Sequence, residues 1–189
     1  MVQVSEYMNQ KIIEEYQKIH NRRDVGMMIG EQVLNYIWNI QDLTFMYPNT
    51  TMLDFGCGKA WAHSQRKVSR LWDVDKVILY DIGIPQYSKR PTHDEFQSLI
   101  SIDVLEHIPE DDIDEVFKYW YHRNMKYVFA TIAAYPARAT LSDGTNAHIN
   151  LNDKAWWMSK IKKHITCHTE IIYMPTNSRK ERVVFKNNS

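Results

Sequence analysis

The sequence predicts an α/β fold with a mostly parallel sheet, an antiparallel last strand and helices on both faces. Three apolar runs carry this prediction, over residues 51–55, 76–81 and 99–102. Each run ends at an acidic residue or a glycine turn. Asp81 follows Asp54 by 27 residues, and a strand, a crossover helix and the next parallel strand together take about 30 residues.

The first run is predicted to be a buried strand that ends in a glycine turn and enters a helix. Gly56 and Gly58 permit positive φ and leave no Cβ, so a ligand can lie directly against the backbone. Asp54, just before the turn, would repel a phosphate but suits a cationic or neutral ligand. The loop departs from a dinucleotide-binding fingerprint because Trp61 stands where that fingerprint needs a third glycine.

The second and third runs place acids at the ends of neighbouring strands. Asp81 ends the second strand, where a carboxylate can accept hydrogen bonds from both hydroxyls of a ribose. Asp103 follows the third run in the same way.

Apolar periodicity predicts the remaining elements. Helices are expected over residues 6–20, 29–40, 60–71, 109–121 and 153–163, and further strands over 126–132, 168–174 and 181–186. The last two strands flank a polar turn at residues 175–178, which predicts an antiparallel hairpin.

The three motifs together resemble a known family. The order L-D-F-G-C-G, V-I-L-Y-D and S-I-D-V-L-E-H-I-P resembles the class I S-adenosylmethionine (SAM)-dependent methyltransferases, over about residues 50–135. The D-V-L-E-H-I-P segment is most similar to the branch that modifies small molecules. Residues 80–83 and 144–148, with the tryptophan pair at 156–157, resemble a set of bacterial and phage methyltransferase-like proteins. The resemblance implies a Rossmann-like methyltransferase fold.

The resemblance also implies that the chain binds SAM and releases S-adenosylhomocysteine. It assigns the cofactor to Asp54, Gly56, Gly58, Asp81, Ile82, Ile102 and Asp103. The two glycines would line the methionyl part, Asp54 would lie near its ammonium, and Asp81 would bind the ribose hydroxyls. Ile82 would pack on the adenine, and Ile102 and Asp103 would border the cofactor on its other side.

The chain departs from the family pattern in two places. Ala60 replaces the third small residue of the loop, which is usually glycine. The segment between Asp81 and Leu99 is short and polar, so the family's third strand and its adenine-binding acid are hard to find there. Asp94 is the candidate for that acid.

His148 is the predicted general base, because it lies late in the polar loop that follows the strand at residues 126–132. The alternative is a histidine that only ties this loop to its own scaffold. Further candidates for the acceptor site are His20, Arg22, Arg23, His107, Tyr135, Trp156 and Trp157. For each of them a packing or solvated role competes with substrate contact.

No metal site is predicted. His164, Cys167 and His168 have a spacing that on a helix would form a zinc-binding face. The apolar alternation through Cys167 indicates a strand instead, and no second ligand pair accompanies it.

Length and composition predict a single domain, with a helical lead-in or lid over residues 1–46 and a Rossmann-like core over 47–189. The chain has a formal net charge of zero, so it lacks the positive charge expected of a protein that binds duplex nucleic acid. Two cysteines indicate a reducing compartment. No apolar run approaches the roughly 20 residues that cross a bilayer, and the N-terminal ten residues lack a signal-peptide core. A cytoplasmic protein, cellular or viral, is therefore expected.

The expected function is methyl transfer from SAM to a small-molecule or nucleotide-sized acceptor. Two alternatives use the same motifs. One is a SAM-binding accessory or regulatory protein without methyl transfer, and the other is an enzyme that consumes SAM by different chemistry. The acceptor atom and the oligomeric state are left open by the sequence.

Overall fold

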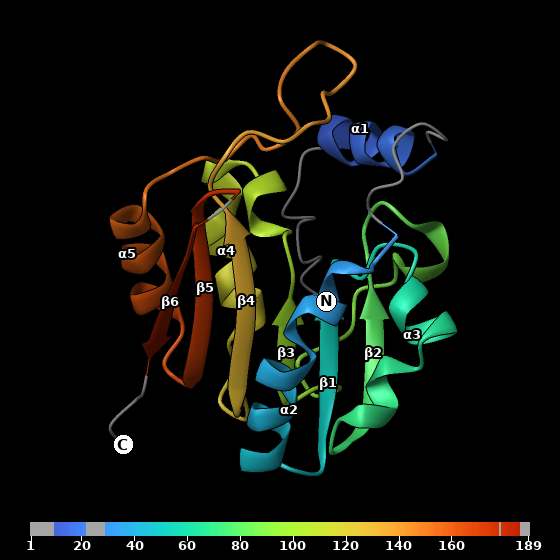
Figure 1. Ribbon diagram of the computed structural model, residues 1–189, viewed down its shortest axis with the longest axis vertical. Coiled ribbons are helices and arrows are strands. Elements are labelled where there is room, and N and C mark those ends of the chain that lie inside the picture. Colours follow the sequence, from blue (N-terminus) through green and yellow to red (C-terminus); the bar gives the residue numbers. More distant parts are fainter. Residues whose placement is uncertain (1–9, 22–28, 178, 186–189) are drawn as a thin grey trace, which may run out of the picture.

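A six-stranded sheet forms the centre of the computed structural model, which describes residues 10–21, 29–177 and 179–185 (Figure 1). The strand order is β2-β1-β3-β4-β5-β6. The bounds are Thr50–Phe55 for β1, Val74–Tyr80 for β2, Ser98–Ser101 for β3, Tyr127–Ala133 for β4, His168–Thr176 for β5 and Arg179–Phe185 for β6. Strands β1 to β5 pair in parallel and β6 is antiparallel to β5. The predicted α/β class and its antiparallel last strand are confirmed, and the arrangement is consistent with a Rossmann-like fold.

Five α-helices and five short 3-10 helices surround the sheet in the described part of the chain. The α-helices are Gln10–Asn21 (α1), Ile37–Met46 (α2), Trp61–Gln65 (α3), Ile113–Trp120 (α4) and Lys154–His164 (α5). The 3-10 helices are Gln32–Tyr36 (η1), Val68–Leu71 (η2), Pro85–Tyr87 (η3), Leu105–His107 (η4) and Glu110–Asp112 (η5). None of the helices in the described ranges is long and apolar enough to span a membrane.

The sheet buries both faces, as alternation along its strands requires. Leu53 and Phe55 of β1 join an apolar cluster with α1, α4 and α5, whereas Met52 joins a second cluster with η1, α2, α3 and η2. Helices therefore cover both faces, as predicted. Strand β4 is buried along its whole length, because it lies in the middle of the sheet under both layers.

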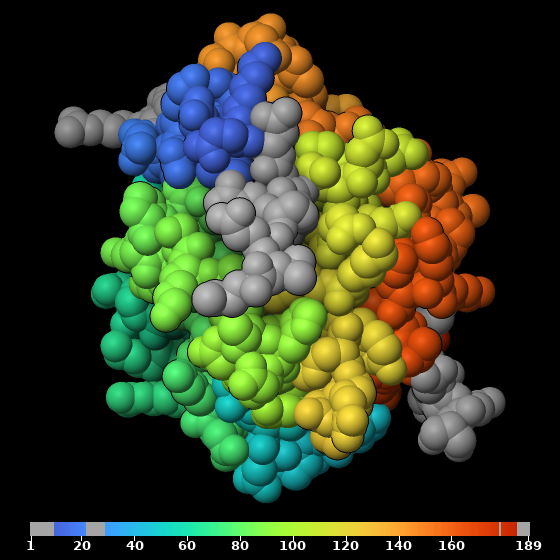
Figure 2. Space-filling model, turned by 180° about the vertical axis from the view of Figure 1, so that it is seen from behind, coloured from blue at the N-terminus to red at the C-terminus, as the bar shows by residue number. Residues whose placement is uncertain are grey.

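Helix α1 lies across the carboxyl ends of the strands rather than on either face (Figure 1). Glu15 accepts hydrogen bonds from the backbone N–H and the hydroxyl of Ser142, at 2.8 and 2.6 Å. The Tyr16 hydroxyl lies 3.0 Å from the carbonyl oxygen of Ala147. These contacts join α1 to the long loop after β4, and the two segments meet at the top of the molecule in Figure 2.

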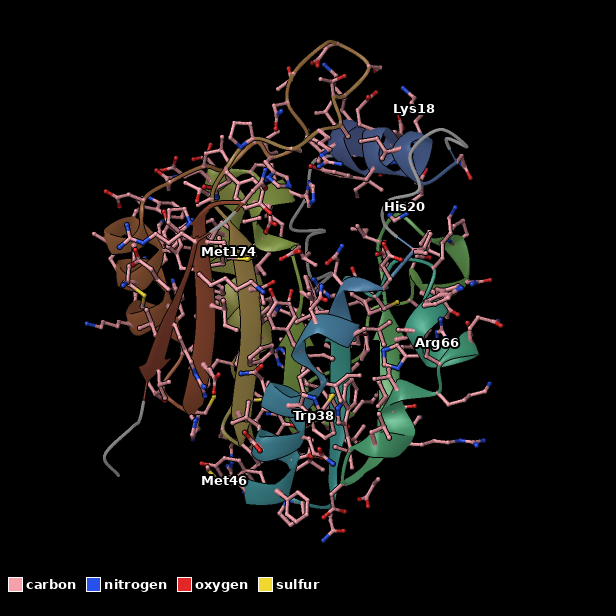
Figure 3. All side chains as sticks on the ribbon, in the orientation of Figure 1. Lys18, His20, Trp38, Met46, Arg66 and Met174 are labelled. Carbon is pink, nitrogen blue, oxygen red and sulfur yellow. The ribbon has the colours of Figure 1, made fainter. Side chains whose placement is uncertain are left out.

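Two predicted helices were wrong in extent. The helix expected over residues 60–71 stops after Gln65, because Lys67 adopts a left-handed φ of 54° that ends an α-helix. The helix expected over residues 29–40 is a 3-10 turn, η1, followed by α2, which runs on to Met46. Helix α2 leaves Trp38 and Met46 on its exposed side (Figure 3).

Between β2 and β3 the described chain forms turns and η3, without a strand. The third strand of the methyltransferase pattern, which was hard to find in this polar segment of the sequence, is therefore absent between β2 and β3. Most other boundaries moved by one or two residues, α4 begins four residues later than expected, and positions 6–9 of the first expected helix lie outside the described residues. The 3-10 turn η5 precedes α4, and Asp153 caps α5 by accepting a hydrogen bond from the N–H of Trp156 at 2.8 Å.

Candidate functional site

A cavity of about 430 Å³ opens at the carboxyl ends of β1, β2, β3 and β4, beside α1. Its volume lies in the range of about 300–1,000 Å³ typical of small-molecule sites. The seven residues that the resemblance assigned to the cofactor and the predicted general base all line it, namely Asp54, Gly56, Gly58, Asp81, Ile82, Ile102, Asp103 and His148. The parallel strands bring these residues together, although they span almost a hundred positions of the chain.

The glycine turn after β1 has the backbone conformation that requires glycine. Gly56 has a φ of 86° and Gly58 a φ of 56°. A Cβ at Gly56 would lie 2.3 Å from a methyl carbon of Val104. The N–H groups of Gly56 and Cys57 both donate to the carbonyl oxygen of Tyr80, at 2.8 and 3.1 Å, so the turn is fixed to the end of β2.

The segment just before η1, at residues 29 and 30, packs closely against this glycine turn. A Cβ at Gly30 would meet the carbonyl oxygen of Cys57 at 2.3 Å. The N–H of Trp61 donates to the carbonyl oxygen of Ile29 at 2.8 Å. Residues 30–33 consequently form part of the cavity wall, a contribution that the sequence did not reveal.

Asp54 is buried and paired with a histidine that sequence reasoning missed. Nε2 of His63, on α3, lies 2.7 Å from Oδ2 of Asp54, and both side chains are below a tenth exposed. His63 is nine residues along the chain, and the first turn of the helix after the glycine loop brings it back over β1. The pairing fixes the orientation of the carboxylate at the cavity wall.

Asp81 accepts two backbone hydrogen bonds at the end of β2. The N–H of Gly58 lies 2.8 Å from its Oδ2, and the N–H of Gly83 lies 2.9 Å from its Oδ1. Nε2 of His20, from α1, lies 3.6 Å from the same Oδ1, and His20 lies toward the strand ends in Figure 3. Burial raises the pKa of Asp81, although His20 and the two N–H donors oppose the shift.

Asp103 follows β3 in a left-handed conformation, with a φ of 55°. Its N–H donates to the hydroxyl of Thr131 at 2.9 Å, and that hydroxyl donates in turn to its carboxylate. Non-glycine residues in this region are strained and concentrate at functional sites. Burial raises the pKa of Asp103.

The charges along the cavity wall are mostly negative. Among the described lining residues the acids are Glu31, Asp54, Asp81 and Asp103, and the one residue that carries a fixed positive charge is Arg138. This balance favours a cationic ligand with hydroxyl donors and disfavours one with several phosphates.

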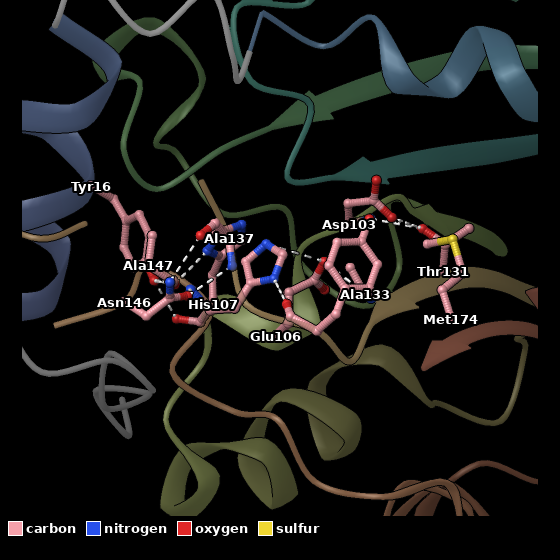
Figure 4. Close-up of polar contacts among 12 residues, drawn as sticks. Tyr16, Asp103, Glu106, His107, Thr131, Ala133, Ala137, Asn146, Ala147 and Met174 are labelled. Atoms are coloured by element: carbon pink, nitrogen blue, oxygen red, sulfur yellow. Dashed lines mark hydrogen bonds and ion pairs between the residues drawn. The ribbon is translucent and has the colours of Figure 1, made fainter. Parts of the chain in front are cut away.

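The His148 ring packs edge-on against that of His107, and its Nε2 lies 4.0 Å from Oε1 of Glu106. Figure 4 labels His107 and Glu106 in this region. Its Nδ1 donates to the carbonyl oxygen of Tyr135, because a carbonyl offers no proton, and its Nε2 is therefore the acceptor nitrogen. Burial lowers the pKa of His148. Burial and the neighbouring His148 lower the pKa of His107 to about 3, so both rings are neutral near pH 7.

Glu106 is the most buried acid of this region, with a fully buried side chain. Its Oε1 accepts from the N–H of Ala133 at 3.2 Å and lies 4.0 Å from Nε2 of His148. Its Oε2 is buried without a hydrogen-bond partner. Burial raises the pKa of Glu106 well above its usual range. The sequence offered a signal for Glu106, since an acid stood next to His107 in an otherwise apolar motif.

Several sequence candidates lie away from the cavity. Asp94 is exposed and accepts from the Thr92 hydroxyl, so it does not supply an adenine-binding acid. Trp157 is fully buried in the core under α5 and Trp156 packs edge-on against it, so neither forms a substrate wall. Arg22 and Arg23 fall outside the described residues.

No family model matches this chain, and no curated protein matches it.

Two of the remaining histidines have separate partners. His164 lies 3.1 Å from Asp114, whereas His168 contacts the hydroxyl of Tyr47 at 3.1 Å. The metal-like spacing of His164, Cys167 and His168 therefore does not converge on one point.

Proposed function

We propose that this chain is a SAM-dependent methyltransferase that acts on a small-molecule or nucleotide-sized acceptor. One observation supports it above the others. The glycine turn after β1 and the carboxylates of Asp54 and Asp81 line one cavity at the carboxyl ends of neighbouring parallel strands. Open α/β sheets bind ligands at that edge.

The residues at this edge fit the cofactor. Gly56 and Gly58 both line the cavity in left-handed conformations, so a methionyl chain could lie against their backbone, whereas the position of a Cβ on Gly56 is taken by Val104. A carboxylate has about four lone-pair sites. Asp81 uses two of them for N–H donors, which leaves capacity for ribose hydroxyls. The acidic wall suits an ammonium and a sulfonium.

When bound, SAM would supply a methyl group on a sulfonium. The side chains of the cavity would bind the cofactor, orient the acceptor and take up its proton. Asp54 and Asp81 would hold the cofactor, and Ile82 and Ile102 would cover its apolar parts. Nε2 of His148 is available to take a proton from an acceptor hydroxyl or amine, because Tyr135 holds its Nδ1 as the donor. Orientation of the acceptor supplies much of the remaining rate enhancement.

Calorimetry of the full chain with SAM and with S-adenosylhomocysteine tests the cofactor assignment. We expect one site per chain, and no heat with either compound for folded protein would overturn the proposal. Methyl transfer from labelled SAM to a panel of hydroxyl and amine acceptors tests the reaction. Cleavage of SAM without transfer would instead support the enzyme that consumes SAM, and binding without any turnover would support an accessory protein.

We also propose a cytoplasmic location. Both cysteines, Cys57 and Cys167, are free thiols, as expected in a reducing compartment. Fractionation of cells that express the chain tests this location. Recovery of the protein from an oxidising compartment would contradict the proposal.

A further inference from the structure

Glu106, His107 and His148 converge beside the cavity, although they come from separate segments. Glu106 and His107 belong to η4, directly after β3, and His148 belongs to the loop after β4. Each residue offers one ligand atom, and the three atoms lie within 4.8 Å of one another. The sequence separated these residues by about 40 positions, so the cluster is visible in the fold alone.

Both histidines are oriented by backbone carbonyls. Nδ1 of His107 lies 2.8 Å from the carbonyl oxygen of Ala147, and Nδ1 of His148 donates to that of Tyr135. A carbonyl partner requires the proton on Nδ1, which leaves the Nε2 lone pair of each ring unprotonated. Metal-bound histidines are held in this way, with the second ring nitrogen donating to a carbonyl or carboxylate.

The Tyr16 hydroxyl reinforces this arrangement. It lies 2.9 Å from the carbonyl oxygen of His107 and 3.0 Å from that of Ala147, and so joins the two segments that carry the histidines. The ligand-bearing loops are therefore held by a side chain of α1 as well as by their own backbone.

Glu106 lacks a counter-charge among the described residues. Its side chain is fully buried, and Oε2 has no hydrogen-bond partner there. A buried carboxylate is costly unless it is paired, protonated or bound to a metal ion. Nearby Asp103 adds a second negative charge rather than neutralising it.

We propose that Glu106, His107 and His148 bind one divalent transition-metal ion at the acceptor side of the cavity. The ligand atoms would be Nε2 of each histidine and a carboxylate oxygen of Glu106. Metal–ligand bonds of about 2.0–2.2 Å place such atoms about 3–3.5 Å apart, so the cluster contracts by roughly 1 Å on binding. Two imidazoles and one carboxylate select ions such as Zn²⁺, Mn²⁺ or Fe²⁺ over Mg²⁺, which prefers oxygen ligands.

His107 and His148 both line the cavity, so the remaining coordination positions of the ion face its interior. Such a position takes water or a hydroxyl oxygen, and a hydroxyl acceptor would be held there beside the cofactor. This last step rests on the proposed methyl transfer, whereas the metal site does not. His148 then acts as a ligand of the ion, and its role as a general base passes to solvent.

The test is metal binding by the full chain without SAM. Metal-free protein is titrated with Co²⁺ and followed by visible absorption, and Zn²⁺, Mn²⁺ and Mg²⁺ are compared by calorimetry. We expect one equivalent of Co²⁺ or Zn²⁺, with Mg²⁺ at least tenfold weaker. Absence of stoichiometric binding, or tighter binding of Mg²⁺ than of Zn²⁺, would overturn the site.

Two ligand variants and one control variant locate the ion. Glu106→Gln and His148→Gln should each weaken Co²⁺ binding by about 100-fold or more, since loss of an outer-shell partner alone costs about 10–100-fold. His93→Ala, at the exposed edge of a stacked histidine pair, should leave it unchanged. Circular dichroism confirms the fold of each variant. Equal binding by the wild type and both ligand variants would show that Glu106 is a protonated structural acid.

Separate calorimetry with S-adenosylhomocysteine distinguishes the two proposals. Metal binding without cofactor binding would overturn the methyltransferase proposal alone. Cofactor binding without metal binding would overturn this site alone.

Discussion

Nε2 of His20 lies 3.6 Å from Oδ1 of Asp81, so α1 places an imidazole against the end of β2. The contact is close, because a Cβ at Gly83 would meet the His20 ring at 2.7 Å. Both side chains are buried, and Nδ1 of His20 has no hydrogen-bond partner in the described chain. A ribose that reaches Asp81 must therefore share its carboxylate with His20 or displace the ring.

Asp81→Asn should weaken binding of S-adenosylhomocysteine by about 10–100-fold. Hydrogen bonds to a charged group contribute about 1.5–3 kcal/mol, and the amide loses the charge and one acceptor. Calorimetry measures the change. Asp94→Asn is the matched control, since that acid is exposed outside the cavity, and an equal loss in both variants would contradict the assignment.

Gly56→Ala should destabilise the chain by more than Gly144→Ala. Both glycines have a φ of 86°, so each substitution incurs the left-handed cost of about 1–2 kcal/mol. A Cβ at Gly56 also collides with Val104, whereas nothing lies within 4 Å of one at Gly144. Urea unfolding of both variants isolates the steric contribution. Equal losses of stability in the two variants would show that the contact with Val104 adds no steric cost.

Asp114→Asn should lower the free energy of unfolding by up to about 1 kcal/mol near pH 7, after allowance for solvent screening. Hydrogen bonds from Lys163, Lys160 and His164 hold the pKa of Asp114 well below its usual value of 3.8. Its contribution is therefore present above pH 4 and is lost as the pH falls through the lowered pKa. Chemical unfolding of wild type and variant from pH 7 to 2.5 measures this. A difference that grows on acidification would contradict the sign.

Trp157→Ala should cost about 3–5 kcal/mol of stability, as expected for a large aromatic side chain removed from a core. Trp157 is fully buried, whereas its neighbour Trp156 is half-buried against it with Lys160 over its ring at 5.2 Å. Trp156→Ala should therefore cost less. Thermal unfolding ranks the two variants. Affinity for S-adenosylhomocysteine should survive in both, and its loss in folded Trp156→Ala would restore a tryptophan to the site.

The strands could be predicted from sequence because their signals are local. Apolar runs that end at Asp54, Asp81 and Asp103 mark both the strand and its carboxyl end, and parallel pairing then brings the three ends to one edge. The helices were predicted less well. Lys67 adopts a left-handed conformation that ends the helix. The apolar pattern continues past this residue, so periodicity alone did not show where the helix stops.

The candidate site divides in the same way. The residues predicted to bind a cofactor lie next to strand ends, so position along the chain was enough to group them. His63 and Glu106 were missed, and His20 was expected near the acceptor rather than beside Asp81, because each takes its place through a tertiary contact. His63 folds back onto Asp54, and His20 lies on a helix that crosses the strand ends. Glu106 is buried by the core, which leaves its Oε2 without a hydrogen-bond partner among the described residues.

The sequence alone determined the α/β class, the acids at the ends of neighbouring parallel strands and the glycine turn, since these depend on residue spacing and backbone freedom. Tertiary structure decided what each side chain meets. It paired Asp81 with His20, removed both tryptophans from the cavity and brought His148 to Glu106 and His107. Contacts between segments far apart in the chain depend on packing and leave no periodic trace in the sequence.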